Sequence, residues 1–274
     1  MRRSTMGEPS ARGLASVIVP CFGQLAYTRQ CVAALARHTR QPWELIVVDD
    51  GSNDGTADYL AGVSDSASFP VKVVTNPANL GFPAAVNRGL AVAEGGYVVL
   101  LNNDAVVCES WLDQLIALAD SDESIGLAGP MSNYASPPQL VESVPYPDLD
   151  GMHRFAAGWR AQHRGRWFIA AKLSGFCLLA KRAVLDAIGG LDERYGPGLL
   201  DDDDLAMRAR AAGFTLAVAA DCFVHHFGSR TFAGSGIDAG ALLAANAAKF
   251  AAKWGDAAPV VRAVTLPAWR GDGA

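Results

Sequence analysis

The chain has 274 residues, half of them hydrophobic, and a formal net charge of -5 at pH 7. This length is sufficient for one large α/β domain with a sizeable core. The acidic balance argues against a broad surface for nucleic acid or for anionic lipid, because those partners select clustered Lys and Arg. We therefore expect no nucleic-acid partner.

Five cysteines are present, an odd number, and no two of them form a C-x-x-C pair. This usage is typical of buried free thiols in a reducing compartment. No apolar run approaches the ~18 residues of a membrane span, and the first residues lack the apolar core of a signal peptide. We expect a cytoplasmic protein without a transmembrane segment, and any contact with the inner face of the membrane to be peripheral.

The first structural unit follows residues 1–13, which have no periodicity and are predicted to be a disordered tail. Residues 16–19 are a short β-branched run stopped by Pro20, which predicts a buried strand leading into a loop that contains Phe22. In residues 26–39 the apolar positions recur every three or four residues, which predicts an amphipathic helix.

A second strand is predicted over residues 44–48, and it runs directly into Asp49, Asp50 and Gly51. The glycine permits a tight turn before the helix that begins near Thr56. A capped β-α turn is the alternative interpretation, but it does not explain two adjacent acids before the glycine.

A third strand, residues 71–74, precedes a turn that contains Asn79, Gly81 and Phe82 and then feeds a helix. Pro83 suits the first turn of that helix. Asn87 lies one turn further along, where it faces either a ligand or solvent.

Residues 97–101 end in the polar triplet Asn102, Asn103 and Asp104. A strand covered on both faces is a continuous apolar run, and in open α/β sheets ligands bind beyond the carboxyl ends of the strands. Asp104 is therefore a first candidate for chemistry. An ordinary polar turn is the alternative.

The next part of the chain is less regular. A helix over residues 111–119 and a strand over 125–129 are followed by a proline-rich excursion, residues 130–150, which we expect to run over the surface as a wall or lid. A helix is predicted over 152–162. A strand over 173–180 is interrupted by Gly175, where another group is expected to approach the backbone closely.

A run of four acids, Asp201 to Asp204, begins a helix that follows a short helix over residues 181–188. The helix dipole favours one or two acids there, but four repel one another. A solvated charged face is one interpretation. The apolar flanks favour another, in which a partly buried carboxylate has the raised pKa of a general base.

The final strand region, residues 214–224, ends in His225 and His226. Successive strand residues point to opposite faces, so at most one of the two serves a given site. An Ala-rich helix over residues 240–254 is predicted to pack, with the tail to residue 274, on a domain that spans residues 14–239.

The polar clusters follow strand ends and are expected to meet at one rim of the sheet. A hard divalent cation there is expected to take oxygen ligands from Asp104 and from a substrate phosphate. One imidazole nitrogen would complete the set of protein ligands. Asp202 is then placed to accept a proton from an attacking hydroxyl.

In this order the motifs resemble the family 2 glycosyltransferases, and among them the bacterial rhamnosyltransferase-like enzymes, over roughly residues 16–232. The segments that carry the resemblance are SVIVP at 16–20, VDDGS at 48–52, NLGF at 79–82 with Asn87, LNND at 101–104, GLDE at 190–193 and the acidic run with Leu205 and Arg208. The resemblance implies an α/β glycosyltransferase A-type fold, with a Rossmann-like mixed central sheet flanked by helices. It also implies a nucleoside-diphosphate sugar as donor, most often with inversion at the anomeric carbon.

The resemblance also implies residue roles. Asp202 matches the family's catalytic base, with Asp201 in place of the usual Glu, and Asp204 with Arg208 matches an orienting pair. Asp104 resembles the last position of the D-x-D metal motif, whose first position here is Asn102, and His226 or His225 resembles the late metal ligand. The predicted donor-binding residues are Pro20, Phe22, Asp49, Asp50, Gly51, Asn79, Gly81, Phe82, Asn87, Asn102, Asn103 and Arg230.

The predicted mechanism is a single displacement assisted by Mn²⁺ or Mg²⁺, in which nucleoside diphosphate leaves towards the metal and Arg230. A UDP- or dTDP-sugar is the expected donor. The acceptor class stays open among a glycan, a lipid-linked sugar, a peptide and a small molecule, and a homodimer is possible. The alternatives are a sugar-phosphate nucleotidyltransferase and a binding module without turnover. A dehydrogenase is disfavoured because no G-x-G-x-x-G follows the first strand.

Overall fold

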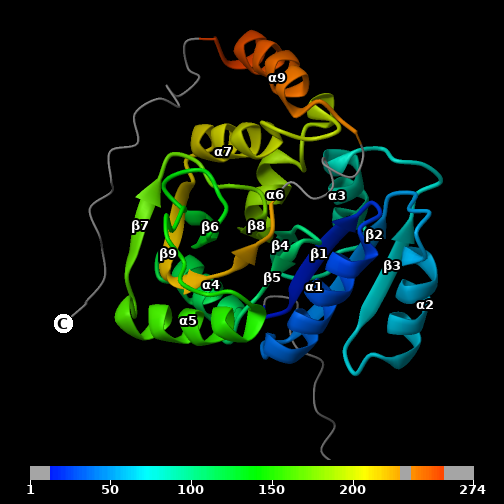
Figure 1. Cartoon of the computed structure of the whole chain (residues 1–274). Helices are drawn as coiled ribbons and strands as arrows, with labels where there is room; N and C mark the ends of the chain where they lie inside the picture. Colours follow the sequence, from blue (N-terminus) through cyan, green and yellow to red (C-terminus); the bar gives the residue numbers. More distant parts are fainter. Residues whose placement is uncertain (1–12, 229–235, 256–274) are drawn as a thin grey trace, which may run out of the picture.

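A central sheet of eight strands organises the computed structural model, which describes residues 13–228 and 236–255 (Figure 1). The strand order is β3-β2-β1-β4-β8-β6-β9-β7, and a separate two-stranded ribbon pairs β10 with β5. The strands are β1 (Ala15–Cys21), β2 (Trp43–Asp49), β3 (Val71–Thr75), β4 (Tyr97–Leu101), β5 (Ala105–Val106), β6 (Ile125–Met131), β7 (Trp167–Ala170), β8 (Cys177–Lys181), β9 (Thr215–Phe223) and β10 (His225–His226).

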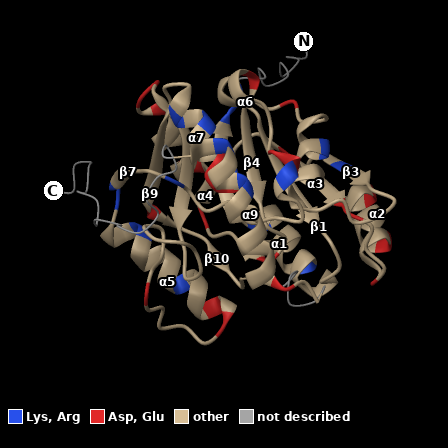
Figure 2. Cartoon of the chain, turned by 90° about the horizontal axis from the view of Figure 1, so that it is seen from above, with Lys and Arg blue, Asp and Glu red and all other residues tan. Residues whose placement is uncertain are grey.

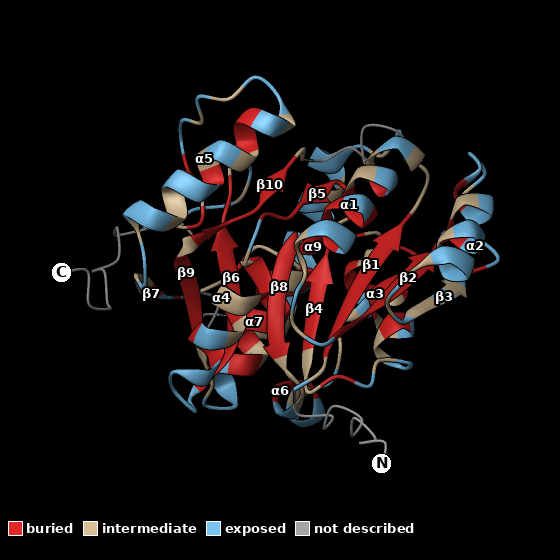
Figure 3. Cartoon of the chain, turned by 90° about the horizontal axis from the view of Figure 1, so that it is seen from below, coloured by how far each residue is buried: buried red, intermediate tan, exposed pale blue. Residues whose placement is uncertain are grey.

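The four strands β1 to β4 form the parallel half of the sheet. Strand β1 pairs in parallel with both β2 and β4, and β2 pairs in parallel with β3. In this register Cys21 lies opposite Asp49, so the carboxyl ends of β1 and β2 coincide. All residues of β1 and β2 are buried (Figure 3), which explains why these strands are continuous apolar runs in the sequence.

The other half of the sheet is mixed. Strand β8 is antiparallel to β4 and β6, β6 is parallel to β9, and β7 is antiparallel to β9 at the sheet edge. The sheet is thus the mixed α/β sheet that the resemblance to the family 2 glycosyltransferases implies.

Helices lie on both sides of the sheet (Figure 1). The spacing of apolar residues predicts most of them correctly. They are α1 (Leu25–His38), α2 (Thr56–Ser66), α3 (Phe82–Leu90), α4 (Trp111–Asp120), α5 (Leu149–Gln162), α6 (Arg182–Ile188), the short 3₁₀ helix η1 (Glu193–Tyr195), α7 (Asp201–Ala211) and α9 (Ala239–Trp254).

Three strand predictions need correction. The predicted strand over 173–180 is wrong in its first half, because β8 begins only at Cys177. The four residues of β7 and the two of β5 were not predicted, since segments this short show no recognisable period. Strand β7 also lies at the edge of the sheet, where Ile169 is 44% exposed and gives no buried pattern.

The ribbon of β5 and β10 joins distant parts of the chain. Its register places His226 opposite Ala105, directly after Asp104. Two residues that are more than a hundred positions apart in the sequence are therefore neighbours at the end of β4.

Charged residues of both signs occur on many of the helices (Figure 2), and in this view Lys and Arg do not cover one continuous face. Across the ranges 13–228 and 236–255, no helix combines the length and the apolar composition that a membrane crossing requires. The predicted tail of residues 1–13 falls almost entirely outside the described residues.

Packing of α3 on the sheet gives a first prediction. A Cβ added at Gly89 would lie 2.5 Å from Ile18 Cγ2 and 3.2 Å from Val48 Cγ2, whereas one at Gly62 in α2 would meet nothing within 4 Å. We expect Gly89→Ala to lower the free energy of unfolding by about 1–3 kcal/mol through overpacking. The control, Gly62→Ala, should raise it by roughly 0.5–1 kcal/mol through helix propensity. Urea unfolding measures both, and an equal gain in the two variants would contradict this packing.

Candidate active site

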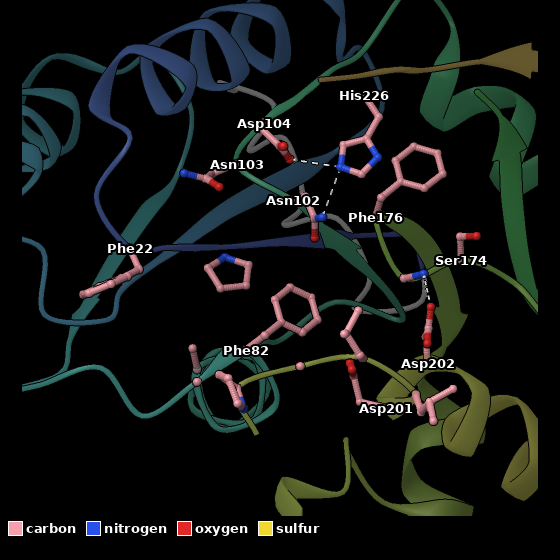
Figure 4. A pocket seen from close by; sticks show the side chains of 18 of the residues that line it. Phe22, Phe82, Asn102, Asn103, Asp104, Ser174, Phe176, Asp201, Asp202 and His226 are labelled. Carbon is pink, nitrogen blue, oxygen red and sulfur yellow. Dashed lines mark hydrogen bonds and ion pairs between the residues drawn. The ribbon is translucent and has the colours of Figure 1, made fainter. Parts of the chain in front are cut away.

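A cavity of about 610 Å³ opens at the carboxyl ends of β1, β2 and β4 (Figure 4). Most of the predicted site residues meet there, although they come from six separate parts of the chain. Those that line the cavity are Pro20, Phe22, Asp50, Asn79, Gly81, Phe82, Asn102, Asn103, Asp104, Asp201, Asp202 and His226.

Asp50, not Asp49, is the strand-end acid that faces the cavity. Its two carboxylate oxygens accept hydrogen bonds from the Leu80 and Gly81 backbone amides, at 2.9–3.1 Å, and from the Asn76 side-chain amide. The Leu80 N–H is shared between the two oxygens, so three donors occupy a carboxylate that has about four lone-pair sites, and about one site is left for a ligand. Asp49 instead accepts from the Ser52 backbone amide and does not line the cavity.

Two glycines of the predicted donor site serve the backbone geometry of its rim. Gly51 has φ +80°, and a Cβ there would lie 2.8 Å from the Ala78 backbone. Gly81 has φ +89°, and its Cβ would lie 2.8 Å from Pro197 Cα. Only glycine allows these approaches. Gly51 itself does not line the cavity, whereas Gly81 does.

Asn87 also lies outside the cavity, which corrects its predicted position. Its side-chain amide donates to the Leu191 carbonyl and the Glu193 carboxylate, and its oxygen accepts from the Leu191 backbone amide at 2.8 Å. Its side chain is partly exposed and bonds to the loop after α6, which folds back onto α3. Arg230 lies outside the described residues.

One end of the cavity is built by Asn102, Asp104 and His226 (Figure 4). His226 Nε2 lies 3.1 Å from Asp104 Oδ1 and 3.3 Å from Asn102 Nδ2. The other ring nitrogen, Nδ1, lies 2.9 Å from the Tyr134 carbonyl oxygen and therefore carries a proton. Phe176 stacks on the imidazole with a centroid distance of 4.9 Å and holds the ring in place.

His225 points elsewhere. Its Nδ1 lies 2.8 Å from the Tyr146 hydroxyl, and burial lowers its pKa to about 4. The alternation expected of adjacent strand residues is thus observed, and only His226 lines the cavity.

The residues at this end fit a hard divalent cation. Asn102 Oδ1 is buried without a hydrogen-bond partner, while Nδ2 of the same amide faces His226 Nε2, which in turn lies 3.1 Å from Asp104 Oδ1. Within the described residues, no group of three or more His, Cys, Asp or Glu side chains forms a metal cluster. Two such side chains and one amide oxygen leave positions for diphosphate and water, as Mg²⁺ and Mn²⁺ sites commonly do.

The opposite end of the cavity carries Asp202 (Figure 4). Its Oδ2 accepts the Gly175 backbone amide at 2.8 Å, and its Oδ1 accepts the Asp203 amide at 2.9 Å. Gly175 is thus the predicted point of close approach, since a Cβ there would lie 3.1 Å from Asp202 Cβ. Burial, with the neighbouring charge of Asp203, raises the pKa of Asp202 to about 6.

The neighbouring acids have different environments. Asp201 is buried at the cavity wall, and burial together with the Asp202 charge raises its pKa well above the ordinary value. Asp203 lies 3.3 Å from Lys172 Nζ in an ion pair. Asp204 is fully buried behind the cavity, where it accepts from Arg208 Nε at 2.8 Å. Asp204 and Arg208 therefore brace α7 and do not line the cavity.

A scan against protein-family models decides the family. The model of glycosyl transferase family 2 matches residues 16–188, which is more than half of the chain. The chain belongs to glycosyl transferase family 2.

Curated relatives agree with this assignment. One relative is an N-acetylglucosaminyl-diphospho-decaprenol L-rhamnosyltransferase of Mycobacterium tuberculosis. Its sequence is 27% identical to that of this glycosyltransferase, and the match covers 72% of this chain and 71% of the relative. An uncharacterized protein of the same species is 32% identical over 78% of this chain and 74% of the relative. One relative is much longer, since the chain spans only 23% of an uncharacterized Sinorhizobium fredii protein.

Solved structures confirm the glycosyltransferase A-type fold. The mannosyltransferase PcManGT from Pyrobaculum calidifontis, in complex with GDP-Man and Mn²⁺, superposes with a TM-score of 0.61 at 19% identity, covering 80% of this chain and 58% of that one. GalNAc-T7 with UDP, GalNAc and Mn²⁺ gives a TM-score of 0.62 at 17% identity, covering 80% of this chain and 44% of that one.

Several cavity-lining residues of the glycosyltransferase were not predicted. They come from the irregular segments before β8, before α7 and inside the predicted excursion, where no period marks them. Gly175 was the only signal before β8, and the prolines after Pro130 the only signal in the excursion. These residues are Tyr134, Ala135, Ser136, Lys172, Ser174, Phe176, Leu199 and Leu200.

The raised pKa of Asp201 gives a prediction about stability. In the folded state the Asp201 carboxyl keeps its proton at pH values where the same carboxyl is already ionised in the unfolded chain. The free energy of unfolding therefore falls as the pH rises from 4 towards neutrality. Asp201→Asn should raise Tm at pH 7, and the difference from the wild type should grow between pH 4 and pH 8. Asp204→Asn is the control and should lower Tm, since it disrupts a buried ion pair. A difference that shrinks with pH would contradict the protonated state.

Proposed function

We propose that this glycosyltransferase moves a sugar from a nucleoside-diphosphate sugar to an acceptor hydroxyl in one inverting displacement, with Asp202 as the general base. The observation that carries the proposal is the arrangement of one cavity. A carboxylate with a pKa of about 6 stands at one end, and the Asn102, Asp104 and His226 group stands at the other.

The environment of Asp202 supports its role. A general base works best when its pKa lies near the working pH, because it is then both ionised and basic. The Gly175 amide holds one oxygen and the Asp203 amide the other, so the carboxylate has a fixed direction before the acceptor arrives. A deprotonated acceptor oxygen then attacks the anomeric carbon from the side opposite the leaving diphosphate, which inverts that carbon.

Asp104, with Asn102 Oδ1 and His226 Nε2, would hold the divalent metal, Mn²⁺ or Mg²⁺. When bound, such an ion neutralises the charge that develops on a leaving diphosphate. The chain's own contribution is orientation: Phe176 and the Tyr134 carbonyl fix the imidazole, and the β5–β10 pairing fixes its distance from Asp104.

The nucleotide would occupy the side of the cavity near β1 and β2. Phe22 and Phe82 supply aromatic surface there (Figure 4), and the Asp50 carboxylate, which has three donors for about four lone-pair sites, could accept a further hydrogen bond from a base N–H. We propose UDP- or dTDP-sugars as donors. A GDP-sugar is the next to test, since PcManGT was solved with GDP-Man.

Among the acceptors, we propose a lipid-linked sugar ahead of a glycan, a peptide or a small molecule. The support is the M. tuberculosis relative, whose name describes rhamnosyl transfer involving N-acetylglucosaminyl-diphospho-decaprenol. Such an acceptor would bring the enzyme to the inner face of the membrane as a peripheral protein.

Removal of the base gives the decisive test. Asp202→Asn should lower kcat by ~10² or more, because the acceptor hydroxyl loses its proton acceptor, while the Kd of nucleoside diphosphate stays nearly unchanged. In the wild type, kcat/KM should rise as the pH increases through about 6, where Asp202 ionises. The measurement is steady-state transfer over pH 5–8, and wild-type turnover in this variant would remove Asp202 from the role.

Two variants at the proposed metal site should change Mn²⁺ binding in opposite directions. Asp104→Ala should abolish the rise in Tm that Mn²⁺ produces together with nucleoside diphosphate, because the one carboxylate ligand is lost. Asn102→Asp should lower the Mn²⁺ concentration at the midpoint of that rise by about tenfold, since it adds a second carboxylate. Manganese binding that is unchanged in both variants would contradict this assignment.

A further inference from the structure

Helix α9 is fastened to the loop that precedes the catalytic acids. Asn246 is completely buried, and its Nδ2 lies 2.9, 2.8 and 3.0 Å from the carbonyl oxygens of Tyr195, Gly198 and Leu199. The two N–H groups of one side chain are thus shared among three backbone carbonyls of a single loop, residues 195–200, which ends where α7 begins.

This loop needs an external support. Leu199 and Leu200 have φ of 72° and 68°, in the left-handed region that residues other than glycine rarely adopt. Such a backbone persists only where its surroundings hold it in place. Asp201 and Asp202 follow directly, so the direction of the two leucine peptides determines where the carboxylates enter the cavity.

Further bonds from α9 converge on the same region. Lys249 Nζ donates to the Arg194 carbonyl at 2.7 Å and to Asn246 Oδ1 at 2.9 Å, so the amide of Asn246 is held at both ends. Lys253 Nζ lies 2.6 Å from Asp204 Oδ1 and 2.8 Å from Asp192. Figure 1 shows α9 beyond α7, on the side away from α4 and α5.

The choice of residue at position 246 also matters. Phe250 already docks α9 through contacts with Tyr195 and Met207, so an apolar residue at 246 would suffice for attachment alone. A buried amide must instead find partners of defined geometry, which makes it a device for placing a backbone.

We propose that Asn246 is a positioning residue: through the loop 195–200 it sets the direction of the Asp202 carboxylate toward the acceptor. The inference rests on the proposed role of Asp202. It assigns a function in the reaction to a helix that lies entirely beyond the family-model match, which ends at Ile188.

The test compares Asn246→Leu, which keeps the volume and removes the amide contacts with the loop carbonyls, with Phe250→Leu, which reduces packing and leaves those contacts. Asn246→Leu should lower kcat by about tenfold to a hundredfold, because small displacements of a reacting group are costly in rate. Its donor KM and nucleoside-diphosphate Kd should stay within about twofold. Phe250→Leu should lower Tm and keep kcat within about twofold.

The pH profile separates positioning from a general loss of stability. The charged groups facing Asp202 are Asp201, Asp203 and Lys172. A released loop admits water and lets the acids move apart, so the acid limb of kcat/KM should shift to lower pH in Asn246→Leu. Phe250→Leu should leave that limb in place.

Lys249→Met keeps the inference testable if Asn246→Leu does not fold, because Lys249 is exposed and only its bonds to Arg194 and Asn246 are lost. It should lower kcat about threefold at unchanged donor KM. Wild-type kcat in Lys249→Met and in any folded Asn246→Leu overturns the inference, and so does an equal kcat loss in Phe250→Leu. The proposed function fails separately, if Asp202→Asn retains turnover.

Discussion

The parallel pairing of β1 with β2 and β4 is the constraint on which the site depends. Parallel strands end at the same edge, so the loops after β1, β2 and β4 meet there although they are separated along the chain. Packing on both buried faces, together with the buried hydrogen bond between the register partners Ser16 and Glu44, fixes how β1 and β2 align. Asp50, Asn102 and Asp104 are therefore placed by the hydrophobic core and not by contacts with one another.

The antiparallel strand β8 completes the cavity from the other side. It pairs with β4, so the segment before it, which contains Gly175 and Phe176, lies against the end of β4. Phe176 then stacks on His226, and the Gly175 amide holds Asp202. One short segment thus contacts both ends of the cavity, which couples the position of the imidazole to that of the base.

The acidic run illustrates a conflict between stability and function. Asp204 is satisfied by Arg208, Lys253 and Trp254, and Asp203 forms an ion pair with Lys172 at 3.3 Å, so these two acids stabilise the beginning of α7. Among the residues that the structure describes, Asp201 and Asp202 form no ion pair, and burial raises the pKa of both. The burial that makes a carboxylate a better base also lowers the stability of the fold. Helix α9 is attached to the loop of residues 195–200, which leads directly into these two acids.

The long periodic segments were predictable because their pattern comes from burial alone. Strands β1, β2 and β4 and helices α1, α4 and α9 were predicted from runs or spacings of apolar residues, and strand ends pointed to Asp50, Asp104 and His226. The short β5 and β7, and the irregular segment before β8, carry no such period.

By itself, the sequence determined the family, the order of the elements and the strand ends at which the polar residues collect, because these follow from local composition and spacing. Only the tertiary structure decided which member of each polar cluster faces the cavity: Asp50 and not Asp49, His226 and not His225. It also showed Asn87 bonded to Leu191 and Asn246 bonded to the loop before Asp201. These contacts join residues that are about 50 to 100 positions apart, and the direction of a side chain depends on neighbours that no local pattern encodes.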